Sequence, residues 1–476
     1  MSAKLTLHPD RALPCEPRVR EVARALYGST RDLPLVCMHG HVDASLFARN
    51  EQFADPAALL ITPDHYVTRM LISQGVAPED LGVARRDGGP VEIDPRAIWR
   101  RFCEGWRFFR GTPSRYWLEH ELVEVFGVDL VPSTQTADAI FDVVSERLAD
   151  PAYRPMQLLD RFGIELLATT DPAQSTLAEH RRLAEQGPEQ QGHRIIPTFR
   201  PDALVQLATP TWRQGIEELA VAADVETGDY AGYLVALRAQ RLRFVAAGGL
   251  ATDHGHLTVD TTPLPESEAA EIYRLARAGE VSPPQAAAFE AHMLFTFAQL
   301  ATEDGLVMQI HPGVLRDHHL DSFRIYGPDI GFDIPVRTDY TRALQPMLQR
   351  FGRDRNFRAI LFTVDETSYS RELAPLAGAY PSLRLGAPWW FLDSPDGMRR
   401  FRETVTETAG FYNTSGFVDD TRAFASIPAR HDLSRRIDAG YLARLVCEHR
   451  LTQDEAVETA IDLAYNLPKT SYARRA

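Results

Sequence analysis

The chain has 476 residues, of which 44% are hydrophobic and 24% charged, and its formal net charge is −14. This length suffices for one large barrel with insertions or for two to three domains, and the apolar share allows a large core. The acidic balance argues against nucleic acid and anionic membranes as partners. An anionic small molecule stays open, because a local cluster of arginines can oppose the overall charge.

Cysteine usage and the N-terminus indicate the expected setting of the chain. The chain has four cysteines, Cys15, Cys37, Cys103 and Cys447. They are widely spaced and form no Cys-x-x-Cys pair, which predicts a reduced, cytoplasmic protein with no cysteine metal cage. Residues 1–20 are charged and interrupted by proline, and no later stretch reaches the apolar length of a membrane span. We therefore expect neither a signal peptide nor a membrane anchor.

The first elements are a short helix and a buried strand. Apolar residues at helical spacing predict an amphipathic helix over residues 16–27. The apolar run 33–41 predicts a strand that ends in His39-Gly-His41. From residue 43 to 161 helical periodicity dominates, so we expect a mainly helical insertion after the first strand. We interpret the aromatic-rich length from Trp99 to Trp117 within it as core.

After the insertion, short apolar runs recur, each ending in polar residues and each followed by a helical stretch. With the first strand they make eight, and the later ones are residues 164–171, 193–200, 244–254, 306–311, 357–364, 383–391 and 416–420. Strands that alternate with helices predict a parallel sheet, and eight such units predict a closed (β/α)8 TIM barrel. We expect one barrel domain over residues 1–476, with a helical C-terminal tail over about 433–466.

Polar residues gather at the carboxyl ends of these predicted strands. They are His39, His41, Asp171, Arg200, His254, His311 and Asp420. In a (β/α)8 barrel these ends converge on one mouth, where active sites form. Histidine, arginine and aspartate at the same end are hard to explain by packing, because buried charges need partners. The pattern predicts a functional mouth.

The pair His39 and His41 suggests a metal site. Residues two apart on a strand point to the same side, so two neutral imidazoles can bind one ion. A carboxylate is the expected third ligand. Asp420 is the best candidate because strands one and eight are neighbours in a closed barrel, and alternation turns only one of Asp419 and Asp420 inward. Asp393 is the competitor.

His311 on the fifth strand is either a further ligand or a hydrogen-bond partner of the substrate. Its position at the end of an apolar run is equally compatible with a barrel-mouth histidine that only satisfies its own hydrogen bonds. The residues alone leave these readings open.

Motifs in order along nearly the whole chain resemble the uronate (glucuronate) isomerase family of the amidohydrolase superfamily. The matching stretches are His39-Gly-His41, Asp64-His-Tyr66 with Arg69, Thr169-Thr-Asp-Pro172, Pro197-Thr-Phe-Arg-Pro-Asp202, Thr252-Asp-His-Gly255, Gln309-Ile-His-Pro-Gly313, Trp389-Trp-Phe-Leu-Asp393, Asp420-Thr-Arg422, and Arg430-His431 with Arg435-Arg436. The chain departs from the family in three places. Pro172 follows Asp171 directly, Thr421 stands where serine is usual, and residues 362–376 show little of the pattern. We expect a divergent member.

The resemblance implies an aldose–ketose isomerase that converts D-glucuronate to D-fructuronate and D-galacturonate to D-tagaturonate through an enediol. It implies one divalent metal ion on His39, His41 and Asp420. Zinc is the ion we expect, although iron, manganese or cobalt would also fit. The partner is a small uronic acid, and we expect a homo-oligomer.

The resemblance also suggests roles for the mouth residues. Tyr66, flanked by His65, is the candidate for moving the carbon-bound proton, if a nearby cation such as Arg422 lowers its pKa. Asp420 could carry the hydroxyl proton, and Arg200 suits the substrate carboxylate. Arg422 could instead polarise the substrate hydroxyl. Trp389 and Trp390 are candidates for stacking on the sugar, and core packing would explain them equally well. Asp253, His254, Gln309 and Asp393 are candidates for binding the sugar's hydroxyl groups, and helix capping or bracing of the barrel would explain them equally well.

Two alternatives remain at this point. A metal-dependent hydrolase or decarboxylase on the same barrel is disfavoured, because its extra lysine on strand four or histidine on strand six is missing; strand six reads Ile360-Leu-Phe-Thr-Val-Asp365. A sugar-acid-binding protein without catalysis is disfavoured by the intact set of His39, His41, Tyr66, Asp420 and Arg422.

Overall fold

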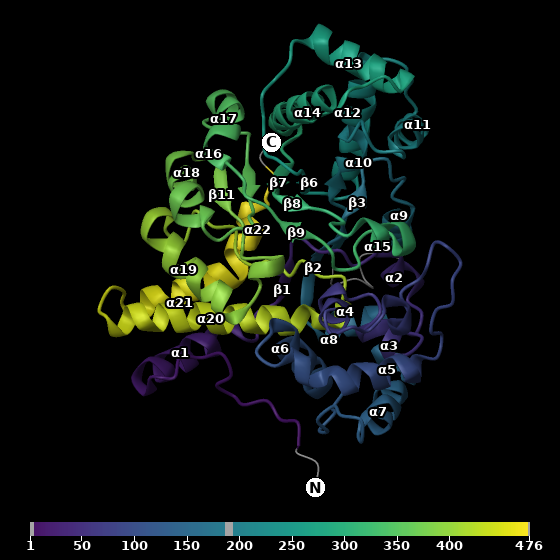
Figure 1. Ribbon diagram of the computed structural model, residues 1–476. Helices are drawn as coiled ribbons and strands as arrows, with labels where there is room; N and C mark the ends of the chain where they lie inside the picture. The colour runs from purple at the N-terminus through teal and green to yellow at the C-terminus, as the bar shows by residue number, and fades with distance from the viewer. Residues whose placement is uncertain (1–3, 186–193, 475–476) are drawn as a thin grey trace.

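A computed structural model describes residues 4–185 and 194–474 and has the predicted (β/α)8 barrel (Figure 1). The barrel wall has eight strand positions, called staves below. Seven staves contain regular strand, and in the second and third staves the strand is split in two. The strands are β1 (Leu35–Cys37), β2 (Ile164–Ala168) with β3 (Asp171–Pro172), β4 (Arg194–Ile196) with β5 (Phe199–Arg200), β6 (Ala251–His254), β7 (Val307–Ile310), β10 (Ala359–Leu361) and β11 (Leu383–Leu385). All ladders between staves are parallel.

The staves follow one another around the barrel in chain order. The ladders run β1-β2-β4 and β11-β10-β7-β6-β5-β3. Main-chain hydrogen bonds join the two series where β2 passes into β3: the Thr169 amide donates to the Ile196 carbonyl (2.9 Å), and the Thr198 amide donates to the Thr169 carbonyl (3.1 Å). The second and third staves are therefore continuous through these breaks.

The eighth stave, residues 413–421, closes the barrel although it forms no regular strand. On one side the Ser415 amide donates to the Leu385 carbonyl of β11 (2.8 Å). On the other the Asp420 amide donates to the His39 carbonyl (3.1 Å), and the His41 amide donates to the Thr421 carbonyl (2.9 Å). Two residues of this stave, Gly416 with a φ of 78° and Asp420 with a φ of 41°, lie in the left-handed region, which interrupts an extended strand.

One predicted strand needs correction. Residues 244–246 belong to helix α12 and not to the fourth strand, which begins at Ala251. A short apolar run is compatible with either a buried helix end or a strand, and the pattern alone does not separate them. In the third predicted strand, His193 lies outside the described residues.

The segment between β1 and β2 is helical, as predicted. Its elements are α2 (Ala44–Arg49), α3 (Pro56–Leu60), α4 (His65–Ile72), η1 (Pro78–Leu81), α5 (Pro95–Glu104), η2 (Gly105–Phe109), α6 (Pro113–His120), η3 (Glu121–Val125), α7 (Ala137–Ala149), η4 (Pro151–Tyr153) and α8 (Pro155–Arg161). The core assignment of the aromatics is confirmed for Trp99, Phe102, Phe109 and Trp117, which are almost completely buried.

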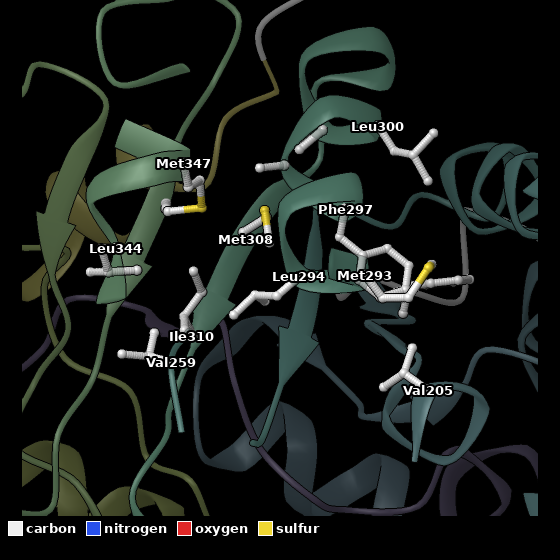
Figure 2. Close-up of a cluster of buried hydrophobic side chains, with 14 of the residues drawn as sticks. Val205, Val259, Met293, Leu294, Phe297, Leu300, Met308, Ile310, Leu344 and Met347 are labelled. Carbon is white, nitrogen blue, oxygen red and sulfur yellow. The ribbon is translucent and has the colours of Figure 1, made fainter. Parts of the chain in front are cut away.

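The later staves are connected by helices, the longer of which cover the outside of the barrel. They are α9 (Ala178–Glu185), α10 (Asp202–Val205), α11 (Trp212–Ala223), α12 (Tyr230–Ala246), α13 (Glu266–Ala278), α14 (Pro283–Asp304), α15 (Leu320–Tyr326), α16 (Tyr340–Ala343), α17 (Gln345–Phe351), η6 (Tyr369–Leu373), α18 (Ala374–Ala379), η7 (Trp390–Leu392) and α19 (Pro395–Ala409). Figure 2 shows how α14 packs on the sheet: Leu294 lies beside Met308 and Ile310 of β7, and Phe297 lies on the other side of the helix beside Met293. A short antiparallel pair, β8 (Val314–Leu315) and β9 (Ile334–Pro335), was not predicted.

The C-terminal helices pack against the first helix of the chain (Figure 1). These elements are α1 (Pro17–Thr30), η8 (Phe424–Ser426), α20 (Ile427–Cys447), α21 (Gln453–Ile461), η9 (Asp462–Asn466) and α22 (Leu467–Ser471). The helical tail thus begins at 427, earlier than predicted, and is broken after 447. No helix in the described part of the chain is both long enough and apolar enough to cross a membrane.

Asp432 on α20 ties three parts of the chain together. Its carboxylate accepts hydrogen bonds from Arg11 (2.8 Å), Arg436 (2.9 Å) and the hydroxyl of Tyr116 (2.9 Å), and also from the hydroxyl of Tyr27. Burial raises the pKa of this carboxyl, but the charges of Arg11 and Arg436 outweigh burial and lower the pKa to about 2.

Asp432→Asn is expected to lower the free energy of unfolding at pH 7 by about 2 kcal/mol, because a carboxyl with a depressed native pKa stabilises the fold above its unfolded pKa. That contribution disappears as the pH falls from about 4 to about 2, so wild type and variant converge in this window. Urea unfolding at stepped pH measures the difference. The exposed Asp321→Asn is the control, and a gap between Asp432→Asn and wild type that stays constant down to pH 2 would contradict the assignment.

Candidate active site

A cavity of about 530 Å³ opens at the carboxyl ends of the staves. Nine of the predicted site residues line it: His41, His65, Tyr66, Arg200, His311, Trp389, Trp390, Asp420 and Arg422. The mouth predicted from the polar strand ends therefore exists.

At the floor of this cavity, side chains from the first and last staves converge. His39 Nε2 lies 3.3 Å and His41 Nε2 3.1 Å from the same oxygen, Asp420 Oδ1. Both ring nitrogens of His39 and this oxygen are buried without a hydrogen-bond partner. Unpartnered buried donor atoms are costly, and two imidazoles with a carboxylate are a donor set that suits a divalent metal ion. The residues fit such an ion.

The protonation of this set also suits metal binding. Burial lowers the pKa of His41, which keeps its ring neutral at pH 7. Burial raises the pKa of Asp420, but the neighbouring rings of His39 and His41 outweigh it and hold this pKa well below its usual value. Burial lowers the pKa of His39, while Asp253 and Asp420 raise it above normal. Negative charge therefore surrounds His39 and favours a positive charge at this point, which is a proton on the ring without metal and a metal ion that displaces this proton when metal binds.

The two competing carboxylates are engaged elsewhere. Asp419 points to the other side of its stave, where Oδ2 lies 3.2 Å from His431 Nε2. Asp393, the alternative third ligand, accepts a 2.6 Å hydrogen bond from the buried guanidinium of Arg430. Asp393 is not among the convergent donors, and it is buried away from the cavity lining, which also removes it as a hydroxyl-binding residue.

A chain of charges runs from the donor set to Arg200. His311 Nε2 lies 2.7 Å from Asp253 Oδ1, and the same oxygen lies 3.8 Å from His39 Nδ1. Arg200 Nη1 lies 3.4 Å from the other oxygen of Asp253, and Arg200 Nε donates to Asp202 (3.0 Å). Asp253 lies beneath the cavity surface, so it braces His39, His311 and Arg200 and does not face the ligand space.

Tyr66 and His65 are placed by the start of helix α4. The Asp64 carboxylate accepts a hydrogen bond from the Tyr66 amide (2.8 Å), which caps the helix and turns both rings toward the mouth. The rings stack with centroids 4.5 Å apart. Burial lowers the pKa of His65 to about 3.

The cation expected to lower the pKa of Tyr66 is not Arg422. Arg422 Nη2 lies 2.9 Å from Asp329 Oδ2. The Arg430 guanidinium lies 5.0 Å from the Tyr66 ring centroid instead. Burial raises the pKa of Tyr66 above its ordinary value, and Arg430 offsets only part of this increase.

The segment around β8 and β9 covers one side of the cavity and was missed by the sequence analysis. It contributes Arg316, Asp317, Asp329 and Asp333 to the lining. The Arg316 guanidinium lies 4.7 Å from the Trp390 ring centroid. Trp389 lies against His311, 4.9 Å between centroids. The available signal was the polar run that follows the fifth strand, Arg316-Asp-His-His319.

Two predicted hydroxyl-binding residues do not reach the cavity. Asp253 faces inward, so its neighbour His254 faces outward. The His254 ring packs against Phe297 of α14, with the two ring centroids 5.1 Å apart. Gln309 faces the barrel interior but is fully buried, and its Oε1 accepts a hydrogen bond from the Tyr472 hydroxyl (2.8 Å). Both side chains serve structural contacts.

Fold and site together define a metal-dependent enzyme on an amidohydrolase-like TIM barrel. A family model described as glucuronate isomerase matches residues 18–472. The uronate isomerase of Rhizobium meliloti is 52% identical over 466 residues, which cover 98% of this chain and 99% of that protein. The chain belongs to the glucuronate isomerase family.

Solved structures agree. The crystal structure of glucuronate isomerase from Caulobacter crescentus matches with a TM-score of 0.96 and 48% identity, over 99% of this chain and 98% of that one. The uronate isomerase from Thermotoga maritima matches with a TM-score of 0.91 and 28% identity, over 98% and 100%. The resemblance drawn from the motifs is confirmed, and the chain is an enzyme of the aldose–ketose isomerase class. The hydrolase and the non-catalytic binding protein are set aside.

Proposed function

We propose that this mouth interconverts uronic acid aldoses and their 2-ketoses, D-glucuronate with D-fructuronate and D-galacturonate with D-tagaturonate, on a metal ion bound by His39, His41 and Asp420. Aldose–ketose isomerisation of uronates is the activity of the family to which the chain belongs. The observation that carries the residue assignment is the convergence of both imidazoles on Asp420 Oδ1 at the cavity floor.

Zinc is the ion we propose, because two imidazoles and one carboxylate are a common zinc donor set that leaves a position for substrate. When bound, a divalent cation polarises the sugar carbonyl. Its positive charge also acts to lower the pKa of Tyr66, against the increase that burial causes. The Asp253 carboxylate beside His39 Nδ1 holds the ring so that Nε2 faces Asp420.

The chain's own residues then divide the proton transfers. The isomerisation moves one proton from C2 to C1 and another between the two oxygens. Tyr66, on the cavity wall beside Arg430, is the group we assign to the carbon-bound proton. Asp420 is ionised and suits the hydroxyl proton. Arg422, oriented by Asp329, is placed to polarise the substrate hydroxyl. Trp389 and Trp390 form the apolar part of the wall.

Arg200 is the residue we assign to the substrate carboxylate. Arg200 lines the cavity. Asp202 contacts its Nε and Asp253 contacts its Nη1, and these two contacts orient the remaining N–H groups of the guanidinium for the substrate. Arg200→Met is expected to lower kcat/KM for uronates about 10- to 100-fold more than for the corresponding neutral aldoses, since a charge-assisted hydrogen bond contributes roughly 1.5–3 kcal/mol. The exposed Arg342→Met is the control. Equal losses for both sugar classes would exclude Arg200 as the carboxylate partner.

Proton NMR of the zinc-loaded protein with D-glucuronate and D-galacturonate in D2O tests the function and its substrates. Appearance of the matching ketose is the expected result, and deuterium at C1 or C2 reports whether the transferred proton exchanges with solvent. Metal-loaded protein that leaves both sugar acids unchanged would exclude this substrate pair.

The cytoplasm is the setting we propose, supported by four cysteines that are free of disulfides. A homo-oligomer is supported by several exposed apolar side chains on one segment, the one around β8 and β9: Leu315, Leu320, Phe323 and Ile334. Light scattering after size-exclusion chromatography measures the molar mass, and a mass of a single 53.3 kDa chain would contradict this part of the proposal.

A further inference from the structure

A second group of donor atoms lies outside the barrel wall at the end of β6. It consists of Asp202, His254 and His256, each offering one ligand atom within 4.8 Å of the others. All three residues are buried; His254 is 0% and His256 4% exposed. This group shares no residue with the set of His39, His41 and Asp420.

The free ring nitrogens of this group are those that a metal would use. His256 Nδ1 lies 2.6 Å from Glu290 Oε1, so Nδ1 is a donor and, in the neutral ring, Nε2 carries the lone pair. His254 Nε2 lies 2.8 Å from the Thr252 hydroxyl, which leaves Nδ1 free. His254 Nδ1 and His256 Nε2 are both buried without a hydrogen-bond partner. A carboxylate that orients a histidine from behind is the usual support of a metal ligand.

Charge and access allow a cation here. The carboxylates of Asp202 and Glu290 carry two negative charges, and Arg200, bonded to Asp202 Oδ2, opposes one of them. Asp202 also accepts from the Gly255 amide (3.2 and 3.1 Å to its two oxygens). Asp202 and Gly255 line the cavity, so the group can be reached from the mouth.

We propose that Asp202, His254 and His256 bind a second divalent cation of the zinc class, supported by Glu290. The role of this ion is structural. It holds Asp202, and through Asp202 the guanidinium of Arg200, and it fixes the backbone turn after β6. Nitrogen-rich sets with one carboxylate favour zinc over magnesium or calcium.

The test is the zinc content of the full chain, loaded with Zn2+ and desalted, measured by mass spectrometry of the metal. Wild type is expected to retain two equivalents, and His41→Ala one. His256→Gln is expected to retain one, and His292→Gln two. His292 is the matched control because it is a buried histidine whose nitrogens already have partners, the Tyr230 hydroxyl (2.7 Å) and the Leu264 amide (3.0 Å).

Anomalous diffraction from zinc-loaded wild-type crystals locates the ions without any variant, which covers the case that His256→Gln does not fold. A peak between Asp202, His254 and His256 is the expected result. One equivalent in wild type, two in His256→Gln, or a second peak elsewhere would overturn the proposal.

Discussion

His41→Ala is expected to lose the divalent metal ion that we assign to His39, His41 and Asp420, and to lower kcat/KM for uronates by about 10³-fold or more. His41 supplies one of the two imidazoles that converge on Asp420, so its removal leaves one imidazole and one carboxylate, too few for tight binding. Loss of several kcal/mol of transition-state charge stabilisation corresponds to a rate loss of this size. Metal analysis and steady-state kinetics on the same preparation measure both effects.

The fold of His41→Ala is expected to remain intact, because the side chain reaches the cavity and is not part of the apolar core. Circular dichroism and the unfolding midpoint of the metal-free proteins check this. His8→Ala, at an exposed histidine that is not among the site residues, is the control for replacing a histidine elsewhere in the chain. A variant with full metal content and turnover would show that His41 is not a ligand.

Arg430→Met is expected to destabilise the protein by about 3–5 kcal/mol. Arg430 is completely buried, donates to Asp393 (2.6 Å) and to the Asp419 carbonyl (3.2 Å), and stacks 3.6 Å from the Trp117 ring centroid. Methionine fills similar space but leaves the buried Asp393 carboxyl without its cation. Burial raises the pKa of Asp393 to about 7 even beside Arg430, so the variant must either bury an unpaired charge or take up a proton at this carboxyl, and losing one partner is the costly half of breaking a buried pair. Urea unfolding of metal-free protein measures the loss.

Asp393→Asn added to Arg430→Met is expected to recover part of that stability, because it removes the uncompensated charge. The exposed Arg342→Met is expected to change stability by less than about 0.5 kcal/mol. If Arg430→Met matched Arg342→Met, the buried pair would have no net role in stability. The activity of Arg430→Met also tests whether Arg430 orients Tyr66.

Much of the site could be predicted because strand geometry is simple. His39 and His41 share a side by the two-residue period, and the closure of the barrel brings Asp420 next to them. The same period predicted that only one of Asp419 and Asp420 faces inward, and Asp420 lies with the two imidazoles.

The period failed at β6 and β7 for a physical reason. Strands of a parallel barrel are buried on both faces, so polar and apolar residues do not alternate and the inward parity cannot be read from the sequence. All four residues of β6 are buried, so the sequence pattern does not distinguish the inward-facing Asp253 from the outward-facing His254. Gln309 depends on Tyr472, a contact between distant parts of the chain that no local pattern indicates.

The covering segment around β8 and β9 was missed because it has neither helical nor strand periodicity over a useful length. The role expected for Arg422 at Tyr66 depended on similar distant contacts, since Arg422 pairs with Asp329 of this segment and the guanidinium 5.0 Å from the Tyr66 ring centroid is that of Arg430. Long connections are placed by tertiary contacts, and their side chains reach a site without any mark in the local sequence.

The irregular eighth stave has a consequence for how the enzyme matures. It brings Asp420 to His39 and His41 by main-chain hydrogen bonds between the last stave and the first. A nascent or truncated chain that stops before residue 420 has both imidazoles but lacks the carboxylate, so it cannot retain the ion as the finished barrel does. The proposed ion on His39, His41 and Asp420 can therefore stabilise only chains that extend past the last stave, whereas the donors of the second proposed site are all present in shorter chains.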